Sequence, residues 1–440
     1  MKAFILKLTL FVAIVSLLTA CGSGDDNATG SENQDGDDVS ISLMHYYNKE
    51  LGEPAPTAQL EKLDEFAANN PDVTINQEIQ SHDNYETKVK TLAAGDELPD
   101  VFLIKGSMTQ QFLENEQVMN LDAFLNENDG WQDQFVDGTL TPFQVDGSAY
   151  GVPISGGATH IVYYNQAIFD EVGIEAFPAT WDEFLAAIDT LNENDVTPIA
   201  LGNKGKWVLN SSYLSTLGNR YTGDEWFNNI LANNGEAAFT DQPFIDALGA
   251  INQLADRGAF NENMNSIDNS EQQAMYMNGK AAMFIEGDWA AGSISSNAPE
   301  DVLENTHVAI FPAIDDAGGN QNTVSGGGGW AYAINADVTG EKLEAIKDMI
   351  YHLTNEDAGK LILEKGQMPA IKVSGTEDMD LGRLTREILE LLEDNKYVPI
   401  YDTILEPALI EEMNNNMQIM VIDQVTPEEA AENIQKVYSK

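Results

Sequence analysis

Strand-like and helix-like segments alternate from residue 39 onward, and this alternation restricts the fold more than any other feature of the chain. Residues 39–44 alternate apolar and polar side chains, as a strand with one buried face does. Residues 57–67 place apolar side chains at helical spacing, and Asn69-Asn70-Pro71 ends that pattern. The order then repeats, with a strand, a helix and a short buried strand at residues 73–79, 85–94 and 101–104. Strands that alternate with helices predict the α/β class.

Two later segments carry a capping box, in which a hydroxyl side chain and an acidic side chain three residues later cap the first turn of a helix. Thr180 and Glu183 predict a helix that continues through Leu191. Thr426 and Glu429, with proline at the first helical position, predict the last helix of the chain. Trp181 lies in the first turn of the earlier helix, so we expect its side chain in the core.

The chain has 440 residues, and 43% of them are hydrophobic. A single core stops growing beyond about 250–300 residues, so this length predicts two lobes. Cys21 is the only cysteine, which excludes a disulfide framework, a thiolate metal site and a cysteine nucleophile from the folded part. The histidines are scattered without the spacing of zinc ligands, and we expect neither a metal nor another cofactor.

Acidic residues greatly outnumber basic ones: 72 Asp and Glu against 22 Lys and Arg give a net charge of −50. A field of this sign repels nucleic acids and other polyanions, so we expect no nucleic-acid partner. An acidic shell also keeps a protein soluble and often accompanies life in salt or at high pH. The sequence does not separate these two conditions.

The N-terminus has the features of a secretory signal. Lys2 and Lys7 supply positive charge, and residues 8–18 form an apolar run too short to span a bilayer comfortably. The sequence Leu18-Thr19-Ala20-Cys21-Gly22 resembles the bacterial lipobox, in which the thiol is acylated and the cysteine becomes the new N-terminus. We therefore expect a signal peptide at residues 1–20 and a lipid anchor on Cys21. The alternative is an ordinary signal peptide with an incidental cysteine.

The segment after the cysteine has the composition of a flexible tether. Residues 22–38 contain no large apolar side chain and many Gly, Ser, Asn and Asp residues. Such a segment cannot bury enough surface to offset the entropy lost on ordering. Residues 21–38 are thus interpreted as a lipidated cysteine and its tether, which holds the folded part outside the cell at the membrane.

A set of short motifs follows in a fixed order along residues 40–440. They are Tyr85-Glu86-Thr87-Lys88, residues 94–101 (AGDELPDV), Tyr150-Gly151-Val152-Pro153, Tyr163-Tyr164-Asn165, residues 178–184 (PATWDEF), residues 279–283 (GKAAM), Gly287-Asp288-Trp289 and residues 326–334 (GGGGWAYAI). Each motif alone is weak. The ordered set resembles family 1 of the bacterial extracellular solute-binding proteins, which includes maltose- and oligosaccharide-binding components of ABC importers.

The resemblance implies a periplasmic-binding-protein-like fold, with two discontinuous α/β lobes joined by a hinge and a ligand cleft between them. We place the first lobe at residues 39–152 plus 284–325 and the second at residues 153–283 plus 326–440. The implied function is that of a monomeric binding protein, not an enzyme. It captures a sugar, expected to be a neutral oligosaccharide, by closure of the cleft and delivers it to the permease subunits.

A sugar ring offers apolar C–H faces to aromatic side chains and hydroxyls to polar ones, and loops at the ends of strands suit both contacts. Tyr46, Tyr47 and Asn48 follow the first strand, and Asp83 follows the next. One tyrosine of the adjacent pair can instead be a core residue.

Later candidate contacts lie in glycine-containing loops or are implied by the family. Glu286, Asp288 and Trp289 follow a strand at residues 281–285 and combine carboxylates with an aromatic face. Gly328, Gly329 and Trp330 end a four-glycine run, which lacks the Lys and Ser/Thr of a phosphate loop and is interpreted as a ligand loop between the lobes. The family resemblance adds an aromatic platform at Trp207 and a late cleft contact at Asp402.

Two other functions remain open from the sequence. One is a secreted carbohydrate-active hydrolase that uses two carboxylates, although among 72 acidic residues such pairs carry no information. The other is a binding protein for a non-sugar solute, such as a polyol, a peptide or a metal chelate.

The lipid anchor depends on one sulfur atom. Replacing it (Cys21→Ala) is expected to abolish acylation and to move the protein from the membrane fraction to the medium or to an unprocessed precursor. Membrane fractionation and mass spectrometry of the N-terminal peptide check this. Lipid on the substituted protein would show that the lipobox interpretation is wrong.

Overall fold

The computed structural model describes residues 39–439 apart from residues 129 and 157–159, and it leaves the side chain of Asp83 undescribed. The described residues belong to one compact unit, Asp38–Lys440. The expected signal peptide, the lipid on Cys21 and the tether lie outside the described residues, as does the predicted Asp83 side-chain contact. No helix in the described part of the chain is long and apolar enough to span a bilayer.

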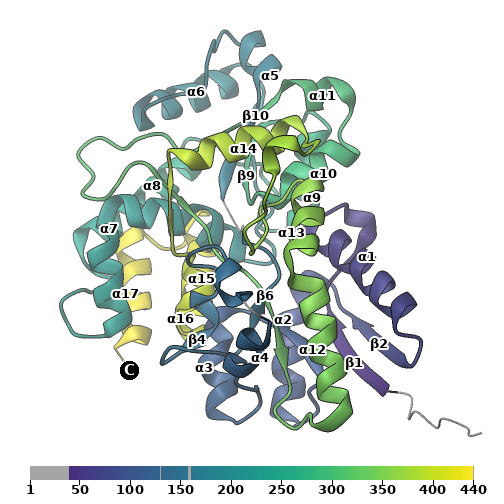
Figure 1. Ribbon diagram of the computed structural model, residues 1–440. Helices are drawn as coiled ribbons and strands as arrows, with labels where there is room; N and C mark the ends of the chain where they lie inside the picture. Colours follow the sequence, from purple (N-terminus) through teal and green to yellow (C-terminus); the bar gives the residue numbers. More distant parts are fainter. Residues whose placement is uncertain (1–38, 129, 157–159, 440) are drawn as a thin grey trace, which may run out of the picture. The chain divides into compact units, whose positions relative to one another are not determined.

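A five-stranded sheet in the order β2-β1-β3-β12-β6 forms the centre of the first lobe (Figure 1). β1 (Val39–His45) runs parallel to β2 (Val73–Ile79) and to β3 (Val101–Ile104). β12 (Ala331–Ile334) is antiparallel to β3 and to β6 (Val152–Pro153). The helices that pack around this sheet are α1 (Pro54–Asn69), α2 (His82–Ala94), α3 (Gly106–Glu114), α4 (Asp122–Glu127), α12 (Gly340–Thr354) and α13 (Glu356–Glu364).

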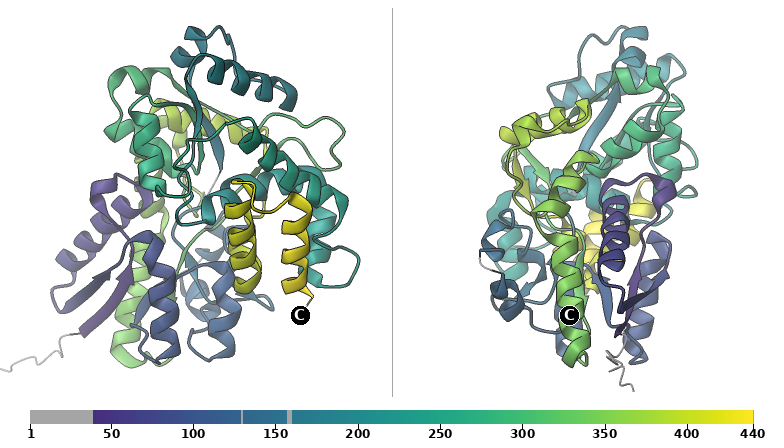
Figure 2. Two further views of the ribbon diagram at one scale, coloured as in Figure 1. Left: turned by 180° about the vertical axis from the view of Figure 1, so that it is seen from behind. Right: turned by 45° about the vertical axis from the view of Figure 1, so that its right-hand side comes forward.

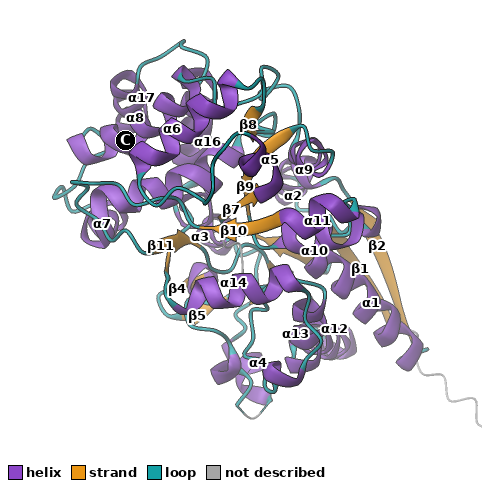
Figure 3. Cartoon of the chain, turned by 90° about the horizontal axis from the view of Figure 1, so that it is seen from above, coloured by secondary structure: helices purple, strands orange, loops and turns teal. Residues whose placement is uncertain are grey.

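A four-stranded sheet, ordered β10-β7-β9-β8, forms the centre of the second lobe (Figure 3). Its strands are β7 (Ile161–Asn165), β8 (Thr197–Ala200), β9 (Ala281–Glu286) and β10 (Thr306–Ala309). One apolar cluster joins it to α5 (Gln166–Glu171), α6 (Trp181–Glu193), α7 (Ser215–Ala232), α8 (Gln242–Asp256), α16 (Pro407–Met420) and α17 (Pro427–Tyr438). A second cluster joins it to α9 (Asn269–Met277), α10 (Trp289–Asn297), α11 (Glu300–Asn305) and α14 (Arg383–Glu393). Because helices cover both faces, every residue of β9 is buried and its sequence is a continuous apolar run up to Glu286.

Shorter elements complete the described chain. Two-stranded ladders pair β4 (Gln144–Val145) with β5 (Ser148–Ala149), and β11 (Thr323–Ser325) with β13 (Lys396–Val398). A π-helix, η4 (Leu209–Leu214), runs directly into α7, and α15 (Tyr401–Ile404) packs against both η4 and α3. Single 3₁₀ turns are η1 (Lys49–Leu51), η2 (Gln132–Gln134), η3 (Thr141–Phe143) and η5 (Thr376–Asp378).

The predicted α/β class with two lobes is confirmed, but the predicted lobe boundaries are corrected by the strand pairing. Residues 284–325 were assigned to the first lobe, yet β9 and β10 both pair with β7 in the second sheet. β12 was assigned to the second lobe, yet it pairs with β3 and β6 in the first. The chain therefore crosses between the lobes after β6, again before β12, and a third time after α13.

Both predicted capping boxes are present. The Thr180 hydroxyl accepts the Glu183 backbone N–H at the start of α6, and Thr426 and Glu429 do the same at the start of α17. Trp181 is buried in the core, as expected for the first turn of a helix that packs on a sheet. At the other end of the second lobe, α16 and α17 lie side by side next to α8 (Figure 2).

Candidate functional site

Aromatic rings from both lobes meet in one group, here called the aromatic cluster. Its members are Tyr46, His82, Tyr85, His160, Trp207, Trp289 and Trp330. In the first lobe the Trp330 ring centroid lies 5.2 Å from that of Tyr46 and 5.4 Å from that of Tyr85. These spacings are typical of paired aromatic side chains.

The cluster continues without a break into the second lobe. The His82 ring centroid lies 6.0 Å from that of Trp330 and 5.7 Å from that of Trp207. Trp207 lies 6.5 Å from Trp289, whose ring is edge-on to His160 at 5.7 Å. The sequence predictions for Tyr46, Trp207, Trp289 and Trp330 thus fall on one group of contacting side chains, although no bound ligand tests their role.

Glycines allow the two loop tryptophans to take these positions. A Cβ at Gly287 would collide with the Trp289 indole. The Trp289 ring therefore packs directly on the Gly287 backbone in the turn after β9. A Cβ at Gly328 would collide with the Thr139 carbonyl, and one at Gly326 would collide with the Tyr397 ring. These glycines serve close packing around the loop before Trp330. A ligand contact by Gly328 or Gly329 stays a prediction.

Trp207 is placed by a turn at the end of the loop that follows β8. Lys206 adopts a left-handed conformation, with φ of 68°, and the Lys206 ammonium donates to the Asn415 side chain at 2.8 Å. Helical turns begin immediately afterwards and lead into η4. The left-handed residue redirects the chain so that Trp207 faces the first lobe at His82.

The structure corrects the predicted role of Tyr47. Its side chain is 1% exposed, and its hydroxyl donates to the Tyr332 hydroxyl at 2.7 Å within the first core. Tyr46, one residue earlier, carries the ring that joins the cluster. Asn48 is exposed, and its side-chain oxygen accepts the Glu50 backbone N–H to cap η1, which leaves the amide nitrogen for the predicted ligand contact.

Glu286 is completely buried rather than exposed in a cleft. Its carboxyl group accepts hydrogen bonds from the side chains of Asn269 and Gln272 and from the Gly287 backbone N–H. Burial raises the pKa of Glu286 to about 8, and nearby Glu53 adds to this effect. The side chain is therefore mostly protonated at neutral pH and organises the turn after β9 from inside.

Asp288 is also buried, and its Oδ2 accepts the Met368 backbone N–H at 2.8 Å. This bond ties the start of α10 to the segment after α13. Both carboxyl groups were predicted as sugar contacts, and both are completely buried in this structure. Both lie beside Trp289 in the chain and hold its loop.

Asp402 forms an ion pair between the lobes instead of an open cleft contact. Its Oδ2 lies 3.1 Å from Nζ of Lys105, the residue after β3, and the two side chains are 4% and 12% exposed. Glu86 Oε2 lies 3.5 Å from the same ammonium. Burial opposes the charge on Lys105, but Asp402 and Glu86 outweigh it and raise the lysine pKa. The Lys105 charge in turn lowers the pKa of Glu86 to about 2.

The sequence interpretation missed Lys105, Tyr85 and His160 as members of the site. Lys105 could have been found by the rule that selected Tyr46, because it directly follows the carboxyl end of a parallel strand. Tyr85 lies in one of the quoted family motifs, and its hydroxyl accepts the Leu103 N–H at 2.7 Å. For His160 the sequence carries no such signal.

The chain matches the model of the bacterial extracellular solute-binding proteins over residues 49–360. It belongs to this family. The multiple sugar-binding protein of Streptococcus mutans is 25% identical over 361 residues, which cover 81% of this chain and 80% of the relative. Three Brucella binding proteins are also 25% identical, but the alignment spans only 55% of their length.

Solved structures extend the similarity to nearly the whole described chain. A chitin oligosaccharide binding protein has a TM-score of 0.84 and 27% identity, over 92% of this chain and 99% of the other. A protein from a study of xylan utilisation by Caldanaerobius polysaccharolyticus has a TM-score of 0.81 and 28% identity, over 91% and 100%. The predicted fold of two lobes around a binding region is thereby confirmed.

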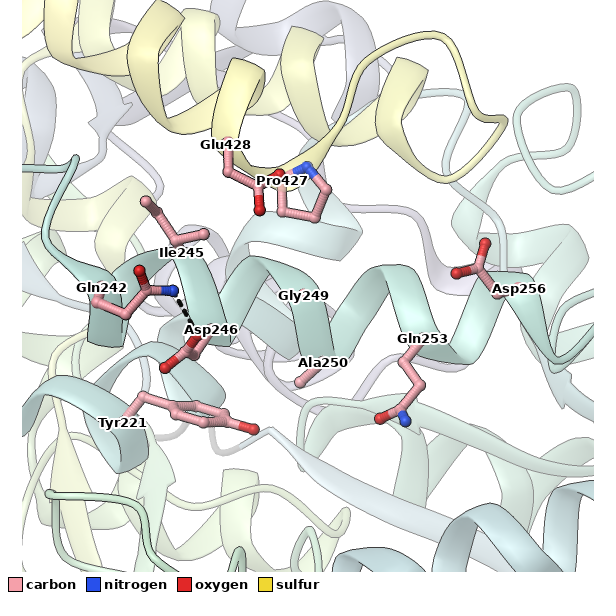
Figure 4. A pocket seen from close by; sticks show the side chains of 10 residues that line it. All are labelled: Tyr221, Gln242, Ile245, Asp246, Gly249, Ala250, Gln253, Asp256, Pro427 and Glu428. Atoms are coloured by element: carbon pink, nitrogen blue, oxygen red, sulfur yellow. Dashed lines mark hydrogen bonds between the residues drawn. The ribbon is translucent and has the colours of Figure 1, made fainter.

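Two surface pockets lie away from the centre of the aromatic cluster, and the first is the larger. It has a volume of about 430 Å³ and is bordered by α8 and the start of α17 (Figure 4). Tyr221 is its one aromatic side chain, while Asp246, Asp256 and Glu428 make it acidic. A second pocket of about 170 Å³ lies beside Gly326 and Tyr397. We place the candidate site at the aromatic cluster, because the cluster joins aromatic rings of both lobes.

The raised pKa of Glu286 predicts a specific pH dependence of stability. The unfolded chain releases this proton near pH 4.5, whereas the folded protein holds it to about pH 8. Between these values the unfolded state binds fewer protons, so this group lowers the free energy of unfolding as pH rises, by at most about 1.4 kcal/mol per pH unit. Glu286→Gln should remove this contribution. Urea unfolding of both proteins from pH 5 to 8 checks it, and parallel pH profiles would contradict the buried-acid assignment.

Proposed function

We propose that the protein is the substrate-binding lipoprotein of an ABC import system and that it captures a neutral oligosaccharide between its lobes. The observation that carries this proposal is the aromatic cluster, in which His82 links the Trp330 indole of the first lobe to the Trp207 and Trp289 indoles of the second. Aromatic faces pack against the C–H faces of sugars, and contact with both lobes couples binding to a hinge motion. Delivery to permease subunits and anchoring through Cys21 complete the proposal.

The relatives support a carbohydrate as the solute. Two of them are named for binding multiple sugars and chitin oligosaccharides, and a third comes from a study of xylan use. The site's charges point the same way, because Lys105 is already paired with Asp402 and Glu86, and Glu286 is protonated at neutral pH. A charged ligand would have to displace these partners, whereas a neutral one would not.

Access to the site requires movement. A sugar ring between two aromatic rings needs about 7–8 Å between their centroids, which is two contact distances of about 3.5–4.0 Å. The rings of His82 and Trp207 are 5.7 Å apart. We therefore propose that the lobes separate at the three crossing segments, that the sugar enters against Trp330 or Trp289, and that the cleft then closes around it.

Thermal denaturation with neutral trisaccharides tests this function. We expect chitotriose, xylotriose or maltotriose to raise the midpoint of unfolding, since a ligand at 100 times its dissociation constant adds about 2.7 kcal/mol. Trigalacturonate serves as the charged control and should have no effect. Chromatography of the recovered sugar distinguishes a binder from a hydrolase, because a binder returns the trisaccharide intact. Absence of stabilisation by every neutral oligosaccharide would contradict the proposal.

The two loop tryptophans should matter more for affinity than for folding. Trp289→Ala or Trp330→Ala removes a stacking face worth about 1–3 kcal/mol, which is roughly a five- to 150-fold loss of affinity. Calorimetric titration with the stabilising sugar measures this loss. Trp131→Ala is the matched control: that ring is buried in the first core, so its removal should cost about 3–5 kcal/mol of stability without a stacking loss. Full affinity with collapsed stability in the loop variants would make both tryptophans core residues.

A further inference from the structure

A series of side-chain contacts joins Trp330 to Trp289 by a route that does not pass through His82 or Trp207. At one end, Nζ of Lys105 lies 5.3 Å from the Trp330 ring centroid and 3.1 Å from Asp402 Oδ2. The other carboxylate oxygen of Asp402 accepts the Ser211 hydroxyl at 3.2 Å. Ser211 Oγ lies 3.4 Å from Nε2 of His160, whose ring is edge-on to Trp289. We call these four side chains, those of Lys105, Asp402, Ser211 and His160, the polar chain.

The hydrogen bonds of the polar chain have a defined direction. Ser211 has one proton and donates it to Asp402, so its oxygen must accept from Nε2–H of His160. Nδ1 is then the acceptor, and the Ser325 hydroxyl, 2.9 Å away, can donate to it. Burial holds the pKa of His160 down at about 3, so the ring is neutral and has one donor and one acceptor. Each group thus fixes the orientation of the next.

The polar chain is buried and crosses between the lobes. Asp402, Ser211 and His160 are each at most 5% exposed, and they belong to the second lobe. Lys105 extends from the end of β3 in the first lobe. Inside a protein such bonds are strong, and an unpaired member is costly, so the members hold one another in place.

We propose that Lys105 is a positioning residue for sugar binding: when the cleft is closed, Lys105 acts through Asp402, Ser211 and His160 to set the separation of the indole rings of Trp330 and Trp289. This inference rests on the proposed function, since the rings are taken as the stacking surfaces. The four residues before Trp330 are glycines, so its ring is held by side chains from other segments: the rings of Tyr46, Tyr85 and His82, and the Lys105 ammonium. The ammonium lies over the ring face, where a cation is attracted by the aromatic charge distribution.

The aromatic rings offer a second route from Trp330 to Trp289, through His82 and Trp207. A substitution that breaks only the polar chain separates the two routes. Ser211→Ala removes one hydroxyl from the middle of the polar chain and touches no ring of the route through His82. Ser212→Ala is the matched control, because its hydroxyl is buried in the same π-helix and has no hydrogen-bond partner among the described residues.

The first measurement needs no sugar. The full chain labelled with 5-fluorotryptophan contains six tryptophans, whose fluorine NMR signals are assigned with single Trp→Phe variants. Ser211→Ala should shift the signals of Trp289 and Trp330 and leave those of the buried core residues Trp131, Trp181 and Trp226 in place. Ser212→Ala should shift neither of the two loop signals. Unshifted Trp289 and Trp330 in Ser211→Ala would overturn the inference.

The second measurement is affinity for chitotriose by calorimetric titration. Ser211→Ala and Lys105→Met should each weaken binding about tenfold, which is about 1.4 kcal/mol. Lys105→Arg keeps the cation over Trp330 and should restore most of the affinity. A role of the lysine stem alone would predict no loss in Lys105→Met, which keeps an apolar side chain of similar length without the charge. Wild-type affinity in Ser211→Ala would overturn the inference. If the wild type binds no neutral oligosaccharide, the proposed function fails, while the fluorine signals still report on the polar chain.

Discussion

The contact between His82 and Trp207 is the point at which the aromatic rings of the two lobes meet, and the rest of the site depends on it. His82 begins α2 beside the edge strand β2 of the first sheet, and Trp207 precedes η4 in the second lobe. On one side of this contact lie Tyr46 and Trp330, and on the other lies Trp289. Because the lobes are joined by three crossing segments, a rotation between them changes the spacing of these rings before it disturbs either sheet. The spacing of the rings therefore depends on the angle between the lobes.

Glycines allow the loops that carry the two tryptophans to pack closely. Gly287 lies under the Trp289 indole, and Gly328 lies against the Thr139 carbonyl, so any larger residue at either position would displace a loop. The cost is that glycine gives these loops little support of their own. The structure supplies support from outside: Asp288 holds the start of α10 through the Met368 N–H, and Lys105 lies over Trp330. Charged and polar side chains thus stabilise the loops that carry the two tryptophans.

The class of fold, the helix caps and four aromatic residues of the candidate site, Tyr46, Trp207, Trp289 and Trp330, could be predicted, because each depends on a short-range pattern or on the family resemblance. The cap of α6 by Thr180 depends only on residues a few positions away. Likewise, a residue that directly follows a parallel strand lies near the crevice, whichever strands are its neighbours. Lobe boundaries depend on pairing between distant strands, and the sequence of β12 does not state that β3 and β6 are its partners. The same limit explains why the sequence did not predict the burial of Tyr47, Glu286 and Asp402. Their burial is decided by Tyr332, Asn269 and Lys105, which lie 285, 17 and 297 residues away in the chain.

The electrostatics of the site differ from those of the whole chain. The net charge of −50 favours cations at the surface, yet beside the aromatic cluster the Lys105 ammonium is already paired with Asp402 and Glu86, and Glu286 keeps its proton at neutral pH. Removing a charged solute from water costs several kcal/mol that only a new counter-charge could offset. Hydroxyl groups lose far less on burial when they find hydrogen-bond partners. The pairing of Lys105 and the protonation of Glu286 therefore support the proposal that the site takes an uncharged solute.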